Sequence, residues 1–553
     1  MAETADLPAS YKTFAELTLS SSERSGGATA LVDDAIELTF HELECAAHAL
    51  AREFQARGVS HGDHVVIMGP HTATQVVAMF ATSLLGAVFV PMDAALPQAR
   101  LRRLLRDVRP RLVIATDASR ERLGAAVYDR FFDWRVAQEC VNANLGVASA
   151  AIPVTPERAV EAGDVAYVMY TAGSAGNPRG VQIEHHALIT FFETYNAKLG
   201  IATGDRCLNT APFHLDVCLL DVFLPLYFGA TVYLNGDFDF GQSVLHKLAQ
   251  HRITHFHAAG ALLAQITHDG SSLDRYDLAA LRVLQTGAEA SKPVIVNQWL
   301  RRLPQLCFVN TYGPPEVTVG CIQFRKLEPG LLGGEHCPIG MPHAGTSVLL
   351  LNAQGHEVAA PWLVGELLLG GEQLMRGYLN APESTRRAFI EFEGELYYRS
   401  GDLAYRDPQG LYWFVGRSDD QVKWLGHRVH LHELRDTLTF HPEVYRTAAG
   451  IVHDAQGRKQ LALVVQVVRA PSAALARSLR EHLPSHLLPG VIGFVVSWPR
   501  LPSGRPDIDG CLESLAQAAA RSFRGVYVLT ADGFEPLSPT ESLGAMPSMM
   551  YAH

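Results

Sequence analysis

Lysine is scarce in this sequence, with seven lysines against 39 arginines among 553 residues, and none follows Lys459. Cysteine is sparse too: the eight cysteines show no CxxC spacing, which excludes a zinc ribbon or a disulfide framework and fits a reducing compartment. The longest apolar stretch, residues 76–92, is interrupted by polar residues, glycine and proline and is too short to span a bilayer. The first residues lack the charged and apolar regions of a signal peptide. We therefore expect a cytoplasmic protein with no membrane segment.

The chain as a whole carries no strong excess of positive or negative charge. The net charge is −11, 19% of residues are charged and 48% are hydrophobic, which is typical of a soluble globular protein. A general nucleic-acid binder would be expected to carry a basic face, so this class is excluded. The one basic run, residues 100–109, alternates arginine with leucine at helical spacing, which indicates the solvated face of an amphipathic helix.

Alternating strand and helix patterns are present from residue 38 onward. Residues 38–57 have helical periodicity, and Thr39 followed by Glu42 predicts a capping box. Residues 65–68 and 87–90 are expected strands on either side of an expected helix at 71–85. This order indicates βαβ units and a mostly parallel sheet, so the predicted fold class is α/β.

A strand that runs into a glycine-rich loop occupies residues 164–180, DVAYVMYTAGSAGNPRG. Glycine has no Cβ, so backbone N–H groups in such a loop can approach a phosphate closely. An ordinary surface turn is the alternative, and the loop lacks the GxxxxGK[ST] pattern of the P-loop. The residues predicted to contact phosphate are Thr171, Gly173, Ser174, Gly176 and Arg179.

The segment 170–180, YTAGSAGNPRG, resembles the YTSGSTGxPKG loop of the adenylate-forming superfamily, with Ala175 and Arg179 as departures. At least six motifs between residues 38 and 509 occur in the order and spacing of that family. They include LDVCLLDVFLPL, VNTYGPPEVTV, GELLLGG, YRSGDL and GRSDDQVKWLGHRVHLHE. The sequence is most similar to the amino-acid-activating adenylation domains of nonribosomal peptide synthetases.

The resemblance implies a large N-terminal domain at residues 1–416, with sheets flanked by helices. It implies a hinge at 417–420 centred on Asp419, and a small mobile α+β domain at 421–510. Residues 511–553 form an extension of unknown role. Rotation about the hinge would rebuild the site between two half-reactions.

The activity implied by the resemblance is ATP-dependent activation of an amino acid. The carboxylate attacks the α-phosphorus of ATP, pyrophosphate leaves, and the acyl-adenylate passes to a phosphopantetheine thiol. No carrier or condensation segment is recognisable, so a separate carrier protein is the expected partner. ATP and Mg²⁺ are the implied cofactors, and neither nucleic acid nor a membrane is an expected partner.

By the same resemblance, the nucleotide is held by Asn310 and Tyr312 at the adenine, by the neighbouring Gly313, and by Asp402 and Arg417 at the ribose. Glu316 would hold Mg²⁺, which prefers hard oxygen ligands beside phosphate oxygens. The implied catalytic residues are Thr171, Arg179, Glu316 and Arg505. Arg505 stands where the family has a catalytic lysine.

Asp216 falls where the family places the aspartate that pairs with the substrate α-ammonium. An aspartate in an apolar run needs a cationic or donor partner, and a cap on a neighbouring helix is the alternative role. The implied pocket wall consists of Val217, Leu220, Gly260, Leu284, Thr286, Thr311, Val319 and Gly320. None is charged, so we expect a mostly apolar pocket and a neutral side chain on the substrate.

Two alternative functions remain open from the sequence. Arginine at position 505 preserves charge but replaces a compact ammonium with a planar fork, so the chain could be a catalytically impaired nucleotide- or carrier-binding homologue. His214 lies where acyl-CoA synthetases often carry a histidine, so an acyl-CoA or aryl-CoA synthetase is the second alternative.

Overall fold

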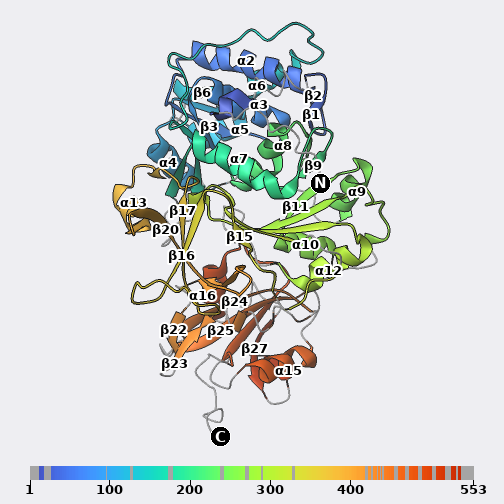
Figure 1. Ribbon diagram of the computed structural model, residues 1–553, viewed down its shortest axis with the longest axis vertical. Helices are drawn as coiled ribbons and strands as arrows, with labels where there is room; N and C mark the ends of the chain where they lie inside the picture. The colour runs from blue at the N-terminus through green and yellow to red at the C-terminus, as the bar shows by residue number, and fades with distance from the viewer. Residues whose placement is uncertain are drawn as a thin grey trace. The chain divides into compact units, whose positions relative to one another are not determined.

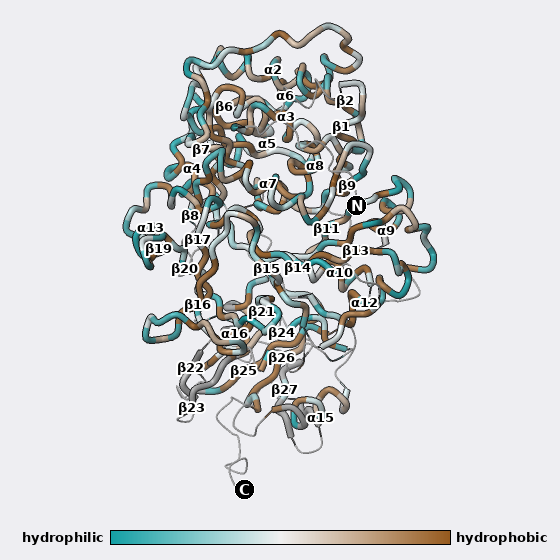
Figure 2. The backbone as a smooth tube through the Cα atoms, in the orientation of Figure 1, coloured by the Kyte–Doolittle hydropathy of each residue, from teal (hydrophilic) through white to brown (hydrophobic). Residues whose placement is uncertain are grey.

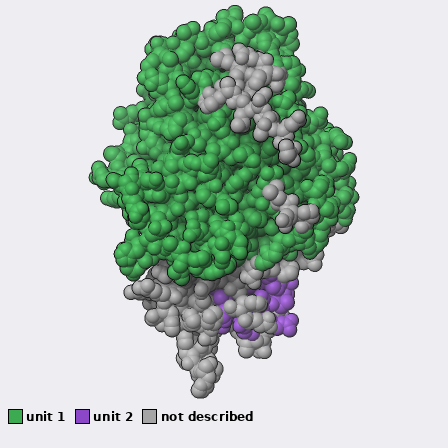
Figure 3. All heavy atoms as spheres, viewed as in Figure 1, with its two compact units in different colours: residues 1–400, 404–415 green, residues 401–403, 416–553 purple. Residues whose placement is uncertain are grey.

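The computed structural model divides into two compact units, formed by residues 1–400 with 404–415 and by residues 401–403 with 416–553 (Figure 3). The division of contacts falls between Val415 and Gly416. The residues that the structure describes are 12–17, 26–94, 96, 98–124, 129–171, 179–236, 242–267, 273–287, 291–326, 330–334, 336–417, 421–424, 427–431, 434–435, 438, 441, 443–453, 459–467, 472–483, 488–500, 506–516, 525–530 and 533–536.

The first unit contains a seven-stranded sheet of order β18-β8-β7-β4-β3-β5-β6. Its strands are β3 (His64–Met68), β4 (Val88–Pro91), β5 (Leu112–Ala115), β6 (Phe131–Asp133), β7 (Val165–Thr171), β8 (Arg179–Glu184) and β18 (Gly377–Tyr378). The strands from β7 to β6 in this order pair in parallel, and β8 and β18 add antiparallel pairs at one edge. The helices of this part are α2 (Phe40–Ala56), α3 (Ala73–Leu84), α4 (Gln98–Val108), α5 (Asp117–Leu123), α6 (Trp134–Asn142) and α7 (His185–Leu199) (Figure 1).

The same unit contains a nine-stranded sheet of order β15-β14-β13-β12-β11-β9-β10-β1-β2. Its strands are β1 (Thr29–Val32), β2 (Glu37–Thr39), β9 (Arg206–Asn209), β10 (Thr231–Leu234), β11 (His255–Ala259), β12 (Val283–Gly287), β13 (Cys307–Tyr312), β14 (Ile322–Lys326) and β15 (Met341–Pro342). Strands β9 to β13 run parallel, which satisfies the expectation of a mostly parallel sheet, and β14 returns antiparallel. The helices of this part are η3 (Leu219–Phe223), α8 (Leu224–Tyr227), α9 (Gln242–Gln250), α10 (Gly260–Thr267), α12 (Pro293–Arg302) and η4 (Pro315–Val317).

A third sheet has the order β16-β17-β20-β19, with β21 paired to β20. Its elements are β16 (Thr346–Leu351), β17 (Gly365–Gly371), β19 (Phe389–Phe392), β20 (Glu395–Arg406) and β21 (Tyr412–Arg417), with helix α13 (Pro382–Ala388) before β19. Leucines run along β16 and β17, and Figure 2 shows this hydrophobic stretch in brown at β16. The mixed α/β fold class predicted from the sequence is confirmed by these sheets and their flanking helices.

The second unit holds the hairpin of β22 (Gln421–Trp424) and β23 (His427–His430) and a five-stranded sheet, β24 to β28. The sheet consists of β24 (Val444–His453), β25 (Lys459–Val467), β26 (Val491–Val495), β27 (Gly525–Thr530) and β28 (Gly533–Pro536), with helices α15 (Ala473–His482) and α16 (Ile508–Ala516). Strand β27 pairs with β26 through Ile492 and Tyr527, so part of the expected extension 511–553 continues this sheet. Tyr527 packs against the hydrophobic core of the sheet, and this contact stabilises the pairing of β27 with β26.

The start of α2 illustrates how local sequence sets the elements. The hydroxyl of Thr39 accepts a hydrogen bond from the Glu42 N–H at 3.2 Å, and the Glu42 carboxylate accepts one from the Thr39 N–H at 2.7 Å. This is the predicted capping box, and it satisfies two of the free N–H groups at the helix start. Among the described residues, no helix has the length and apolar character needed to cross a membrane.

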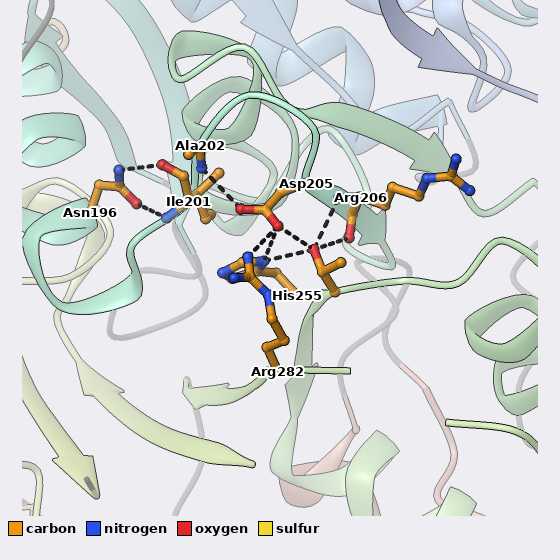
Figure 4. A network of polar contacts seen from close by, with 8 residues as sticks. Asn196, Ile201, Ala202, Asp205, Arg206, His255 and Arg282 are labelled. Atoms are coloured by element: carbon orange, nitrogen blue, oxygen red, sulfur yellow. Dashed lines mark hydrogen bonds and ion pairs between the residues drawn. The ribbon is translucent and has the colours of Figure 1, made fainter. Parts of the chain in front are cut away.

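A buried polar network fastens the starts of three parallel strands (Figure 4). Asp205, directly before β9, accepts hydrogen bonds from the Thr254 hydroxyl at 3.0 Å and from the guanidinium of Arg282. Thr254 also bonds to the ring of His255 at 2.9 Å, and burial lowers the pKa of His255 to about 4, so this ring is neutral at pH 7. Ligands of parallel sheets bind at the opposite, carboxyl ends of the strands, so this edge serves to hold the sheet together.

Candidate active site

The predicted site residues of the second sheet gather at the carboxyl ends of β12 and β13. Asn310 of β13 lies beside Thr286 of β12, and Thr311 lies beside Gly287. Because side chains alternate along a strand, this register puts Thr286 and Asn310 on one face and Thr311 on the other. The predicted residues therefore contribute to both faces of the sheet near one edge.

The first face holds the side chain of Asn310 in a fixed orientation. Its Oδ1 accepts a hydrogen bond from the Thr286 hydroxyl at 3.1 Å, and its Nδ2 donates to the Pro338 carbonyl at 2.8 Å. An amide NH₂ has two protons, so Nδ2 of Asn310 has a second N–H besides the one that binds Pro338. Leu284, on the same face, packs into the hydrophobic core with α10 and α12. Leu284 is therefore a core residue on the face of Asn310, and it does not share a face with Thr311.

The second face is polar. The hydroxyl of Thr311 lies 2.6 Å from that of Tyr195 on α7, and the amide of Gln285 on β12 donates to the same Tyr195 hydroxyl. A Cβ on Gly320 would come within 2.7 Å of the Thr311 methyl group and 2.8 Å of the Tyr195 ring, so Gly320 packs directly on this pair. Neither Tyr195 nor Gln285 was predicted from the sequence. The packing of α7 on the sheet brings Tyr195 to Thr311, and the register of β12 against β13 puts Gln285 on the same face.

The turn after β13 is tight, and a side chain from another segment of the chain holds it in place. A Cβ on Gly313 would lie 2.6 Å from the Gly320 Cα, so the two backbones pass in direct contact. Thr318 and Val319 adopt left-handed conformations with φ of 47° and 65°, which are unfavourable for such side chains. The amide of Gln373 donates to the carbonyls of Thr318 and Gly320 at 3.3 and 3.0 Å and so fixes this strained turn.

Glu316 lies in the 3₁₀ turn η4, with 8% of its surface exposed. It accepts a hydrogen bond from the Tyr378 hydroxyl at 2.8 Å, and the guanidinium of Arg179 lies over the Tyr378 ring, 5.1 Å from its centre. Burial and the charge of Glu316 raise the pKa of Tyr378 to about 12, so this phenol remains a donor. Tyr378 therefore connects the predicted Mg²⁺ ligand to the predicted phosphate-binding arginine.

The base of the predicted phosphate loop is an antiparallel pair. Thr171 at the end of β7 lies opposite Arg179 at the start of β8. Tyr170 donates to the Asp107 carboxylate of α4 at 2.6 Å, which anchors β7 just before the loop. The predicted phosphate ligands Gly173, Ser174 and Gly176 lie outside the described residues, as do the predicted hinge residue Asp419 and the predicted catalytic Arg505.

The predicted amine-binding Asp216 is half-buried just before the π-helical turn η3. Val217 beside it is also half-buried, and Leu220 of the turn is buried. The pKa of Tyr167 on β7 is raised well above its usual value by burial and by the charge of Asp216. The Asp216 carboxylate thus acts electrostatically on a buried phenol of the first sheet.

Asp221, in the middle of η3, holds the turn to the end of β9. Its carboxylate accepts hydrogen bonds from the Asn209 amide at 2.8 Å and from the N–H groups of Thr210 and Ala211 at 3.0 and 3.1 Å. Burial raises its pKa to about 7 despite these donors. This carboxylate is therefore part of the frame that carries Asp216.

The raised pKa of Asp221 predicts a pH dependence of stability. The folded state holds this proton up to about pH 7, whereas an unfolded aspartate releases it near pH 4. The contribution of Asp221 to the free energy of unfolding is therefore full below pH 4 and lost as pH rises toward 7, by up to about 4 kcal/mol. In urea titrations, Asp221→Asn should gain stability relative to wild type between pH 4 and 7. A pH-independent difference between the two proteins would contradict this.

In the second unit, the two predicted ribose ligands lie together. Arg417 donates to the Asp402 carboxylate at 2.9 Å, and Asp402 is buried while Arg417 is half-exposed. A carboxylate held by an arginine remains ionised and can accept ribose hydroxyls. In the part of the chain that the structure describes, no group of three or more His, Cys, Asp or Glu side chains could hold a metal ion by itself.

Comparison with known proteins identifies the class to which this site belongs. The family model of AMP-binding enzymes matches residues 20–379. The chain therefore belongs to the AMP-binding enzyme family, the adenylate-forming superfamily that the sequence motifs resemble.

Relatives with curated descriptions include proteins of nonribosomal peptide synthesis. The chain is 32% identical to the isonitrile lipopeptide synthase of Streptomyces coeruleorubidus over 91% of its length, and 30% identical to gramicidin S synthase 2 of Brevibacillus brevis over 86%. It spans only 33% and 10% of those two proteins. It is 31% identical to novobiocin biosynthesis protein H of Streptomyces niveus, of which it covers 83%.

Solved structures with the same fold include two CoA ligases. The anthranilate CoA ligase AuaEII, in complex with anthranoyl-AMP, has a TM-score of 0.79 at 22% identity and is matched over 93% of this chain and 99% of that one. The O-succinylbenzoate CoA synthetase MenE of Bacillus subtilis, in complex with AMP, has a TM-score of 0.74 at 22% identity, over 89% and 97%. At this identity the likeness concerns the fold.

Proposed function

We propose that this chain activates an amino acid with ATP and passes the acyl group to the phosphopantetheine thiol of a carrier protein. The observation that carries the proposal is Asp216. It lies just before η3, in a segment similar to that of amino-acid-activating domains. A carboxylate at this position suits a substrate ammonium. The relatives in nonribosomal peptide synthesis support an amino acid as the substrate class and a carrier protein as the partner.

The residues present fit ATP and Mg²⁺. The carboxylate of Glu316 supplies a hard oxygen ligand, and Arg179 places a fixed positive charge at the base of the glycine-rich loop. We propose Glu316 as the Mg²⁺ ligand, with Thr171, Arg179 and the loop residues holding phosphates. Bound Mg²⁺ would supply neutralisation of the phosphate charge. The chain's own residues would act by positioning and charge stabilisation.

An aryl-CoA or acyl-CoA synthetase is the second candidate, because His214 lies where acyl-CoA synthetases often carry a histidine. Pyrophosphate exchange with a panel of α-amino acids and aryl acids separates the two. Preferred exchange with α-amino acids supports the proposal, whereas preferred exchange with aryl acids that lack an amine supports the second candidate. Transfer assays with coenzyme A and with a phosphopantetheinylated carrier protein then identify the acceptor.

A nucleotide-binding homologue without activity is the remaining candidate, because arginine replaces lysine at position 505. If Arg505 fills the catalytic role, we expect Arg505→Ala to reduce pyrophosphate exchange about 10²-fold or more, and Arg505→Lys to retain or raise it. Absence of exchange in the wild type, with ATP binding retained in calorimetry, would establish the inactive homologue. Rapid exchange that is indifferent to Arg505→Ala would place the catalytic role on another residue.

A further inference from the structure

The sheet face that carries Thr311 contains more polar groups than an apolar amino-acid pocket requires. Four side chains from three strands and α7 meet there, and we refer to them as the polar cluster: Tyr195, Gln285, Thr311 and Gln323. All four are buried, with Gln323 only 2% exposed. Buried polar groups are normally fully hydrogen-bonded, so the pairing within the cluster indicates what it can still bind.

The internal bonds of the cluster leave capacity unused. The Tyr195 and Thr311 hydroxyls share one hydrogen bond at 2.6 Å, Gln285 donates to Tyr195, and Gln323 donates to Thr311 at 3.5 Å. Two hydroxyls have two protons and only one lies in their shared bond, so with the two amides in these orientations the other proton has no acceptor among the described residues.

The Oε1 atom of Gln323 is buried and likewise has no hydrogen-bond partner in the described part of the chain. Exchanging the oxygen and nitrogen of this amide would place the oxygen at Thr311, where it can accept the second hydroxyl proton, and would leave the nitrogen unpaired instead. One end of the Gln323 amide therefore stays unsatisfied in either orientation, and this end is what the cluster offers to a ligand.

The ionisable groups next to the cluster are either uncharged imidazoles or an ammonium that already binds backbone carbonyls. His257 lies on the same sheet face, and burial lowers its pKa to about 4. His343 packs edge-on against the Tyr195 ring, and burial, with the nearby charge of Lys198, lowers its pKa to about 3. The Lys198 ammonium donates to the Gln323 and Met341 carbonyls, both at 3.1 Å. Both imidazoles are therefore uncharged at pH 7, and the ammonium is bound to backbone.

We propose that the amino acid activated by this chain has an uncharged hydroxyl or amide group in its side chain, which bonds to Thr311 and Gln323. This inference rests on the proposed function, because it needs the substrate to lie beside Thr311 and Gly320. A hydroxyl or an amide can accept a hydrogen bond and donate one, and so can pair with the unsatisfied end of Gln323 in either orientation and with a hydroxyl of the cluster. An apolar analogue would leave the Gln323 amide unpaired and should therefore react more slowly.

The test compares amino acids of similar size that differ in one polar group: threonine with valine, asparagine with leucine, and tyrosine with phenylalanine. In pyrophosphate exchange, we expect kcat/KM for the polar member of the accepted pair to exceed that of the apolar member by at least about 10-fold. Tyr195→Phe removes the hydroxyl that organises the cluster and keeps the ring. We expect it to lower this ratio several-fold while exchange with the apolar member is retained.

Thr267→Val is the matched control, because it also removes a buried hydroxyl, which binds the Trp299 indole at 2.8 Å on the other face of the sheet. It should leave the ratio unchanged. This inference, but not the proposed function, would be overturned if the wild type preferred the apolar members. It would also be overturned if Tyr195→Phe and Thr267→Val changed the kcat/KM ratio equally. The wild-type ratio decides the matter even if Tyr195→Phe does not fold. Exchange with no α-amino acid would overturn the proposed function and this inference together.

Discussion

Glu316→Gln is expected to reduce pyrophosphate exchange on the order of 10²-fold and to raise the Mg²⁺ concentration needed for half-maximal rate by about 10- to 100-fold. Glutamine can still accept the hydrogen bond from Tyr378, so the turn η4 should keep its shape. What is lost is the negative charge that would bind the cation. A Mg²⁺ titration of the exchange rate measures this directly, and binding of Mg²⁺ and ATP in calorimetry provides a readout that does not depend on turnover.

Tyr378→Phe is the companion variant, because it keeps the ring under Arg179 and removes the hydroxyl that donates to Glu316. We expect a smaller effect of the same kind, about 10-fold. Glu366→Gln serves as the control, since Glu366 is a carboxylate of the third sheet paired with Arg399 at 2.5 Å. Its loss should leave the Mg²⁺ dependence unchanged. If Glu316→Gln titrates with Mg²⁺ like the wild type, Glu316 does not bind the metal.

Asp216→Ala is expected to reduce kcat/KM for α-amino acids by about 10²- to 10⁴-fold. Removing one partner of a largely desolvated ion pair costs about 3–5 kcal/mol, and this cost applies in the ground state and in the transition state alike. The affinity for ATP should stay at the wild-type value, because the proposed nucleotide ligands lie on other segments. Measured KM values for the amino acid and Kd values for ATP separate the two effects.

The deaminated form of the preferred amino acid completes this test. It lacks the ammonium, so it should react slowly with the wild type and no more slowly with Asp216→Ala. An unchanged KM for the amino acid in Asp216→Ala would remove the amine-binding role. A parallel fall for the amino acid and its deaminated form would instead indicate that Asp216 supports the structure, as Asp221 does through the β9 terminus.

The regular elements of the first unit could be predicted from the sequence because local signals specify them. The Thr39–Glu42 capping box, the strand at β3 and the helix α3 are each encoded within about twenty residues. The motif VNTYGPPEVTV also named Asn310 and Thr311 as site residues, and both lie near the end of strand β13. What local patterns could not indicate is which sheet face each residue occupies, since this depends on the register of β12 against β13.

The polar side of the site could not be predicted for the same reason. Tyr195 lies on a helix 116 residues before Thr311, and Tyr378 lies 62 residues after Glu316. Gln285 alone had a local signal, because a polar side chain interrupts the apolar strand β12 and alternates with Leu284 and Thr286. The predicted wall counted residues from both faces of the sheet and so described the pocket as more apolar than the face at Thr311.

The amide of Gln373 that holds the carbonyls of Thr318 and Gly320 has a consequence for which substitutions this turn can tolerate. The backbone at residues 318–320 is held by a side chain from a different segment. Asparagine or glycine at position 319 would relieve backbone strain. Val319 is only 8% exposed and packs in the hydrophobic core, so either change would also remove buried apolar contacts. Gly320 admits no side chain, because Tyr195 and Thr311 fill the space beside it. The two neighbouring positions are thus restricted for different reasons, position 319 by packing in the core and position 320 by the lack of room for a Cβ atom.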